Sequence, residues 1–417
     1  MNFSKNNKNT LTITILVGFI SLIIAAYIGE DTLGGAKYDY SFHEKYIISF
    51  YENFFQTLRE FGNDYEVRNS PIFFMYSSFF LKAGLNIENL KYFNLIIIIP
   101  LIIFFIKSID LRFNNLSFET KAFLTSIIFI SPTIRSLSAW PYPITWAICF
   151  FLISIFYFLK FQKTETKKKK LKYSLLNIIF LALSAYFTPN FGVFVILYLY
   201  YFFKYFKVSK ESFLIILINI ALSLPALYFL IIKDFYLFKH EVEHVINNYS
   251  IYDTLNISNK IIIITSIIFL FFVPFIEVQK IKYKTNFQNS WLLLSFIFVN
   301  IFFFNFSKGL GGGLFFHLSN VLFNGPILLF LIFAISLFIF KKYELFSNHN
   351  IFLFMLLIIY NIQSTIYYKY YDPIIFFMIL FLFKFKNNFD IEKIAKKYFL
   401  LYLFFLSISF GKRFLIY

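Results

Sequence analysis

An aspartate and a histidine four residues apart, Asp39 and His43, begin the segment best suited to acid–base chemistry. They lie in the stretch KYDYSFHEKYI at residues 37–47. If a helix begins near Tyr40, both side chains point to one side, and Asp39 lies within or just before the first turn. A carboxylate partly desolvated beside aromatic rings becomes a better general base. The alternative interpretation of Asp39 is a helix cap.

Four other segments carry basic or polar side chains that suit an anionic ligand. They are NDYEVRNSP at 63–71, SPTIRSLSAWPYP at 131–143, KGLGGGLFFHLSN at 308–320 and IYYKYYDP at 366–373. An arginine fork binds phosphate through two parallel hydrogen bonds, and a glycine loop lets backbone amides approach an anion. The candidate phosphate ligands are Arg68, Arg135, Lys308, His317, Lys369 and Tyr371. The alternatives are interfacial anchors in an aromatic belt and a plain glycine linker.

A metal site has little support from residue types. The chain has 5 histidines and one cysteine, Cys149, which makes a multi-ligand zinc or iron site improbable. His240-Glu241-Val242-Glu243-His244 satisfies the spacing of a zinc-protease helix. No apolar helix frames that segment, so we interpret it as a solvated amphipathic loop.

The elements that must position these residues are membrane helices. Of 417 residues, 59% are hydrophobic and 15% are charged, with a mean hydropathy of +0.69. Apolar runs come in blocks of about 20 residues, which is the length that spans a bilayer. This composition excludes a water-soluble enzyme and a disordered chain. The sequence predicts an all-α, polytopic integral membrane protein with about 11–13 transmembrane helices.

Two amphipathic segments lie in the first outer loop, at about residues 30–90. Residues 41–61 place Phe42, Tyr46, Ile47, Phe50, Phe54, Leu58 and Phe61 along one stripe. Residues 71–83 begin at a proline and are too short to span a bilayer. Both are predicted to be interfacial helices that lie on the membrane.

The charge distribution predicts an orientation. With the N-terminus in the cytosol, the cytosolic segments hold 25 of the 39 basic residues and 8 of the 22 acidic ones. The other side is then neutral, so the whole net charge of +17 lies on one face. This is the pattern of the positive-inside rule, and it makes nucleic acid an improbable partner. The first span, at 11–29, is interpreted as an uncleaved signal anchor.

The order of these features resembles that of the GT-C glycosyltransferases. The residues that carry the resemblance are KYDYSFHEKYI at 37–47, RNSPIFFMYSSFFLKAG at 68–84 and WPYPITWAICFFLISIFYFLKF at 140–161. They are similar to the acidic motif with a trailing histidine, the proline-led second interfacial helix and the segment after the third span. Protein O-mannosyltransferases, lipid A aminoarabinose transferases and dolichyl-phosphate-glucose glucosyltransferases belong to this superfamily.

The resemblance implies three modules: a cytosolic tail at 1–10, a core at 11–205 that holds the first outer loop, and a variable transmembrane module at 206–417 without a soluble domain. It implies Asp39 as catalytic base, with His43 beside it. The donor would be a polyprenyl-phosphate-linked sugar, the acceptor a lipid-linked or envelope glycan, and membrane lipid the surroundings. Many members have two adjacent acids where Tyr40 follows Asp39 here, so a divalent cation, Mg²⁺ or Mn²⁺, is left open.

The expected location is a bacterial inner membrane, with the active site facing the periplasm or exterior. Abundant Phe, Ile, Lys and Asn are typical of an AT-rich bacterial genome. Two alternatives remain. An O-antigen-type polymerase would place its main outer loop late and load it with arginine. A lipid-linked sugar flippase would show an inverted repeat and charges within the membrane.

Overall fold

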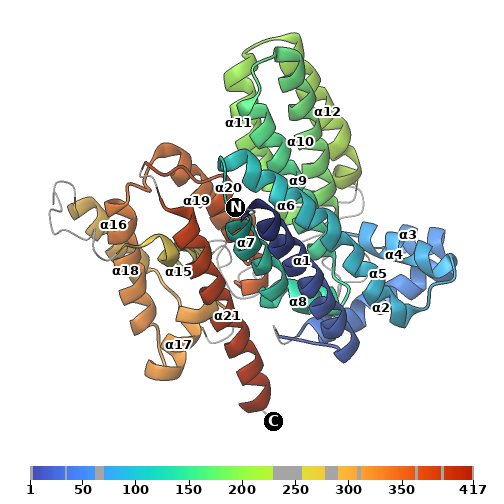
Figure 1. The fold of residues 1–417 in the computed structure, drawn as a ribbon, viewed down its shortest axis with the longest axis horizontal. Coiled ribbons are helices and arrows are strands. Elements are labelled where there is room, and N and C mark those ends of the chain that lie inside the picture. The colour runs from blue at the N-terminus through green and yellow to red at the C-terminus, as the bar shows by residue number, and fades with distance from the viewer. Residues whose placement is uncertain are drawn as a thin grey trace. The chain divides into compact units, whose positions relative to one another are not determined.

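The computed structural model describes residues 3–32, 35–61, 70–228, 256–277, 290–307, 311–361, 365–386 and 389–415. These residues are helical almost throughout (Figure 1). Apart from one parallel bridge between Gly311 and Ile366, they contain no β structure. The all-α prediction is confirmed.

Seven described helices are long and apolar enough to cross a membrane. An eighth arises if α7 (Phe118–Ile130) and α8 (Pro132–Ala139), which meet at a bend of 50°, form one span. The protein is therefore polytopic, as predicted. Several of the other expected spans correspond, in the described residues, to helices that are shorter than a membrane span. For example, α20 (Ile374–Phe381) has 8 residues, or about 12 Å of helix, whereas a bilayer core is about 30 Å thick.

The chain forms two compact units whose bounds differ from those of the expected modules. Unit 1 contains residues 1–236 and 395–417, and unit 2 contains residues 237–394. Most of the last helix, α21 (Ile391–Leu415), therefore belongs with the N-terminal helices. Lys396 of α21 lies 3.5 Å from Glu119 of α7, and the rings of Phe399 and Phe123 are 5.4 Å apart.

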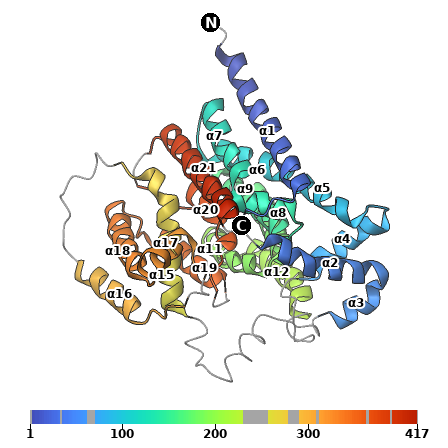
Figure 2. The same ribbon diagram turned by 90° about the horizontal axis from the view of Figure 1, so that it is seen from below.

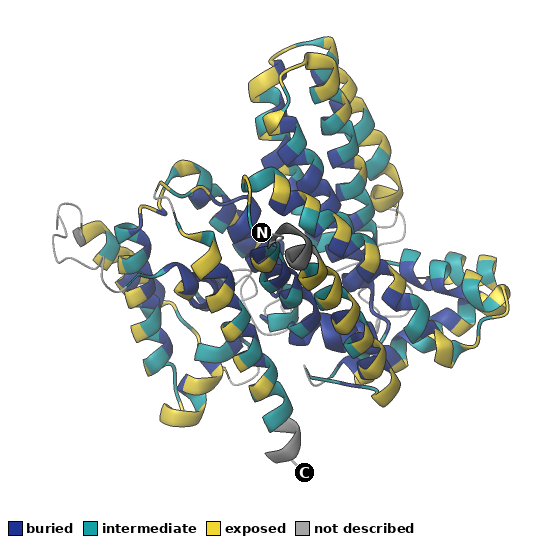
Figure 3. Cartoon of the chain, viewed as in Figure 1, coloured by how far each residue is buried: buried dark blue, intermediate teal, exposed yellow. Residues whose placement is uncertain are grey.

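Unit 1 is built around α9 (Pro143–Lys163), which is buried along nearly its whole length (Figure 3). It packs against α6 (Ile98–Arg112) and antiparallel to α10 (Lys167–Phe187). Polar side chains join the α9–α10 pair: Asn177 donates to the backbone oxygen of Ser154 at 2.8 Å, and Ser184 to that of Ala147 at 2.7 Å. Small and polar residues allow such close approach of helices in an apolar solvent.

More peripheral helices complete unit 1. The helices α11 (Val195–Phe206) and α12 (Lys210–Leu227) contact each other, and α12 also contacts α10 (Figure 1). Most of α12 is exposed, as expected of a helix that faces lipid. The first helix, α1 (Phe3–Ile28), packs along α7 and α8.

Unit 2 is centred on α15 (Ile257–Phe272), a helix that is buried on nearly all sides. It packs against α18 (Ile327–Lys342) and against four other helices. They are α16 (Ser290–Phe302), α17 (Gly313–Phe323), α19 (Asn348–Tyr360) and α20.

The close packing of α1 on α7 depends on Gly18. A Cβ atom at this position would lie 2.3 Å from the Phe129 ring. We expect Gly18→Ala to destabilise the protein by about 1–3 kcal/mol, because the ring cannot move without disturbing the core. Thermal unfolding can be followed with a thiol-reactive dye, since the single cysteine, Cys149, is buried. Gly411→Ala is the control, because a Cβ there meets nothing within 4 Å; equal transition temperatures would contradict the packing argument.

The ends of the unit 1 helices differ in charge, and this predicts their sides of the membrane. Lys168 lies in the first turn of α10, at the end rich in lysine, and Lys37 lies in the first turn of α2, which follows the opposite end of α1. In a Cys149→Ala protein, we expect Cys at position 37 to react with an impermeant maleimide in intact cells, and Cys at position 168 only after permeabilisation. The reverse labelling pattern would show that the orientation is wrong.

Candidate functional site

Three short helices follow α1 and lie together in unit 1 (Figure 2). They are α2 (Ala36–Glu52), α3 (Phe54–Glu60) and α4 (Ile72–Lys82). The segment expected as one helix at 41–61 is thus two, because Asn53 leaves the helical region with φ −138° and ψ 69°. The second expected helix, at 71–83, is present as α4 and begins directly after Pro71.

Asp39 lies in the first turn of α2, because this helix begins at Ala36 and not near Tyr40. Its side chain is partly exposed. The capping role belongs instead to Asp31, whose carboxylate accepts backbone N–H bonds from Gly35 at 2.9 Å, Ala36 at 3.2 Å and Lys37 at 3.3 Å. The carboxylate of Asp39 is therefore not the cap of this helix.

His43 lies one turn beyond Asp39 and faces inward. Its ring is 3% exposed and lies 4.7 Å from the ring of Tyr142 and 5.4 Å from that of Phe74. Tyr40 is buried on the same face, 5.8 Å from the ring of Trp140. Burial, together with the nearby carboxylate of Glu44, raises the pKa of Tyr40, so its phenol stays neutral. The buried face of α2 therefore packs against aromatic rings, whereas Asp39 is partly exposed.

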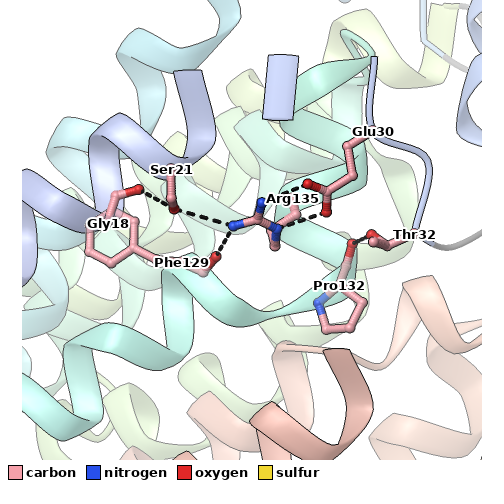
Figure 4. Close-up of polar contacts among 7 residues, drawn as sticks. All are labelled: Gly18, Ser21, Glu30, Thr32, Phe129, Pro132 and Arg135. Carbon is pink, nitrogen blue, oxygen red and sulfur yellow. Dashed lines mark hydrogen bonds and ion pairs between the residues drawn. The ribbon is translucent and has the colours of Figure 1, made fainter. Parts of the chain in front are cut away.

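Arg135 is held in a buried ion pair rather than presented to a ligand (Figure 4). Its Nε and Nη2 donate to the two carboxylate oxygens of Glu30 at 2.7 and 2.6 Å. Nη1 donates to Ser21 Oγ and to the backbone oxygen of Phe129, each at 3.2 Å. Glu30 is 0% exposed and Arg135 is 8% exposed. The predicted phosphate ligand is thus engaged by an acid that sequence reasoning did not single out.

Local geometry explains how Glu30 reaches this position. Gly29 ends α1 with a φ of +64°, and the amide of Glu30 donates to Ala25 O at 2.9 Å, as in a Schellman motif. A Cβ on Gly29 would lie 3.1 Å from the Trp140 ring, so the position favours glycine for space as well as for conformation. The sequence signal for Glu30 was an acid directly after a glycine at the end of an apolar span.

The short helix α8 supplies Arg135 and is buried at every residue. It begins where Ser131 precedes Pro132, because the residue before a proline is driven out of the helical region. Within the described part of the chain, the buried hydroxyls of Thr133 and Ser138 have no hydrogen-bond partner. Such groups leave capacity for a water molecule or a ligand group beside α8.

A small pocket adjoins α4 at the same end of unit 1. It is lined by Phe73, Tyr76, Ser77, Leu90, Phe93, Asn94, Pro141 and Trp146, and has room for little more than one water molecule. Trp146 Nε1 donates to Asn94 Oδ1 at 2.7 Å, and Asn94 Nδ2 donates to Leu137 O at 3.2 Å. Burial raises the pKa of Tyr76 to about 12, so this phenol remains a neutral donor.

The predicted residues of unit 2 that the structure describes are His317, Lys369 and Tyr371. Gly312 donates its amide to Ile366 O at 2.7 Å, so the described end of the glycine loop lies beside the start of the 366–373 segment. Tyr371 is fully buried, the Lys369 ammonium lies 5.5 Å from the ring centre of Tyr367, and His317 is exposed on α17.

Two buried charged residues of unit 2 were not among the candidate ligands, although Asp372 lies within the 366–373 segment. Lys260, in the first turn of α15, is 3% exposed and donates to Asn361 O at 2.8 Å. Asp372 is fully buried, and its charge, after the larger effect of burial, raises the pKa of Tyr368. A lysine at the edge of an isoleucine run was the available signal for Lys260.

Several other predictions lie outside the described residues. Arg68, Lys308 and the His240–His244 segment are among them. Within the described ranges, no group of three or more His, Cys, Asp or Glu side chains could hold a metal ion. The carboxylates of Glu30 and Asp31 are taken up by Arg135 and by backbone amides. These two carboxylates are therefore not available to a cation, and no step of the proposed reaction depends on one.

Comparisons with known proteins found no match. No protein-family model, no curated protein and no solved structure is significantly similar to this chain.

The Glu30–Arg135 pair predicts a specific pattern of stabilities. Arg135→Met should destabilise the protein by about 3–5 kcal/mol, because it leaves a buried carboxylate without its partner. The double variant Glu30→Leu/Arg135→Met should recover most of that loss, since no buried charge remains. The measurement is thermal unfolding detected by labelling of Cys149.

The matched control is the surface pair of Lys167 and Glu211, 2.7 Å apart. Glu211→Gln should leave the transition unchanged, because exposed pairs contribute little. A double variant less stable than Arg135→Met would show that the pair is not the source of the effect.

Proposed function

We propose that this protein is a glycosyltransferase of the GT-C type in a bacterial inner membrane. It transfers a sugar from a polyprenyl-phosphate carrier to a lipid-linked or envelope glycan acceptor on the outer side. The observation that carries the proposal is the place of Asp39. Its partly exposed carboxylate stands in the first turn of a short amphipathic helix, beside aromatic rings and at the end of α1 opposite the lysine-rich end.

The chemistry of such a carrier suits this location. An isoprenoid tail lies in the bilayer while its sugar phosphate lies at the interface, so the reacting atoms meet the enzyme at the level of interfacial helices. Tyr76, Phe93 and Trp146 line the pocket next to α4. Tyrosine and tryptophan are the amphipathic aromatic residues that are enriched at membrane interfaces. The proposed reaction requires a base for the acceptor hydroxyl, a cation for the leaving phosphate and access from the lipid for the carrier.

In the proposed reaction, Asp39 accepts the proton of the acceptor hydroxyl. The acceptor oxygen attacks the anomeric carbon, the bond from that carbon to the phosphate oxygen breaks, and the carrier phosphate leaves with the electron pair. Lys37, two residues before Asp39 and exposed, is the lysine of α2 closest to Asp39 in the sequence and balances the charge of the departing phosphate. Its ammonium lies 5.7 Å from the centre of the Trp140 ring.

A lipid-linked sugar flippase is the second candidate. The observation that favours it is Lys260, a charged residue buried in a helix that could span the membrane. Such residues commonly mark the path of a transported substrate. Transport of a lipid-linked sugar by purified protein, without sugar transfer, would favour this candidate.

Replacement of Asp39 tests the first proposal. We expect Asp39→Asn to lower surface-glycan synthesis in a deletion strain by about 100-fold or more, which is the usual contribution of a general base. Glu52→Gln, at the exposed far end of α2, should leave synthesis unchanged. Protein levels are compared by immunoblot. Wild-type synthesis by Asp39→Asn would remove this residue as the base.

A further inference from the structure

Three consecutive residues after α1 each bind a residue of α8. The carboxylate of Glu30 accepts from Arg135 at 2.6 and 2.7 Å, and that of Asp31 accepts from Ser136 Oγ at 2.9 Å. Thr32 Oγ1 donates to Pro132 O at 2.9 Å. Residues 30–32 are named the clasp here. A stretch of three residues bonded at each position has little freedom to shift relative to α8.

Asp31 connects the two helices on either side of the clasp. One carboxylate accepts both the Ser136 hydroxyl of α8 and the backbone amides of Gly35, Ala36 and Lys37 at the start of α2. The first amides of a helix have no hydrogen-bond acceptor within the helix, and here the carboxylate of Asp31 supplies one. Its negative charge also interacts favourably with the helix dipole. The start of α2 is therefore held in one register on α8.

Asp39 lies two residues after the last amide that Asp31 binds. The amide of Asp39 itself donates to Gly35 O at 2.9 Å, within the same turn. Because this turn is rigid, a shift of its first residues moves the Asp39 carboxylate by a similar amount. Displacement of a reacting group by about 1 Å can cost about 100-fold in rate.

The buried Glu30–Arg135 ion pair fixes the position of α8 relative to α1 and α7. Arg135 binds Ser21 of α1 and the backbone oxygen of Phe129 at the end of α7, in addition to Glu30. It thereby joins the two helices at the bend that separates α7 from α8 (Figure 4). Loss of Glu30 would leave the guanidinium without its carboxylate and release α8.

We propose that the clasp sets the position of the catalytic base: Asp31 is the positioning residue for Asp39, and the Glu30–Arg135 pair anchors α8 as the reference to which Asp31 binds. The inference rests on the proposed function of Asp39. It assigns Arg135 a role in holding the site together, in place of phosphate binding. It also gives two nearby acids different roles: Asp31 positions the start of α2, and Asp39 accepts the proton of the acceptor hydroxyl.

Trp140 offers a readout of the clasp that does not depend on activity. It directly follows α8, and its ring lies 5.8 Å from the ring of Tyr40 on α2. The chain has 3 tryptophans, so Trp146→Phe and Trp291→Phe together leave Trp140 as the sole tryptophan, which can be excited selectively over tyrosine. Acrylamide quenching of its fluorescence then measures how closely α2 covers it.

The test compares four variants of the full-length protein, with quenching measured in that background and surface-glycan synthesis measured with all three tryptophans present, because Trp146 lines the pocket next to α4. Asp31→Ala removes both ends of the link, and Ser136→Ala removes only the α8 end. We expect each to raise the quenching constant at least twofold and to lower surface-glycan synthesis by about 10-fold to 100-fold. Asp31→Asn keeps one acceptor oxygen and should restore part of both. The control is Asp390→Asn, which alters the acid that accepts the Lys393 amide at the start of α21.

The outcomes separate the two proposals. Unchanged quenching in Asp31→Ala and Ser136→Ala would overturn the clasp, whatever the activity of Asp39→Asn. Raised quenching with wild-type synthesis would show that the clasp holds α2 without positioning a base, and would also overturn the inference. If Asp39→Asn is fully active, the proposed function fails, while quenching still reports on the link between α2 and α8. Labelling of Cys149 on heating confirms that each variant is folded.

Discussion

The Glu30–Arg135 ion pair is the interaction on which the candidate site depends. Two charges are withdrawn from water at the end of a membrane helix, which is costly unless each is matched closely. Here the match is bidentate, and the remaining donor of Arg135 is used by Ser21 and a backbone oxygen. The pair therefore specifies one arrangement of α1, α7 and α8, because any other arrangement would leave a buried charge unpaired.

Polar contacts elsewhere in unit 1 also fix how its helices pack against one another. In hydrocarbon, backbone groups are satisfied within the helices, and side-chain hydrogen bonds become the specific contacts between them. Asn177 and Ser184 serve this purpose between α9 and α10, and Asn94 joins Trp146 to α8. Apolar packing alone would permit helices to slide, whereas these bonds are satisfied in one register.

Unit 2 places its buried charges differently. Lys260 stands in the first turn of α15, bound to the backbone oxygen at the end of α19, and Asp372 lies buried before α20. Nearby, Gly312 bonds to Ile366, and a Cβ on Gly311 would come within 2.6 Å of Ile366 O. The bond of Lys260 joins the first turn of α15 to the end of α19, a helix of 13 residues that is too short to cross a bilayer alone.

Composition and periodicity were sufficient for the helical membrane class, for α4 and for an amphipathic segment near α2, because these depend on local hydrophobic pattern. They also placed Asp39 at the start of that segment. Tertiary structure decided the rest: the helix begins at Ala36, Asp31 takes the cap, and Arg135 binds Glu30 across 105 positions of chain. A pattern of residue types states which side chains can pair with a charge, but only the packing of distant helices determines which one does.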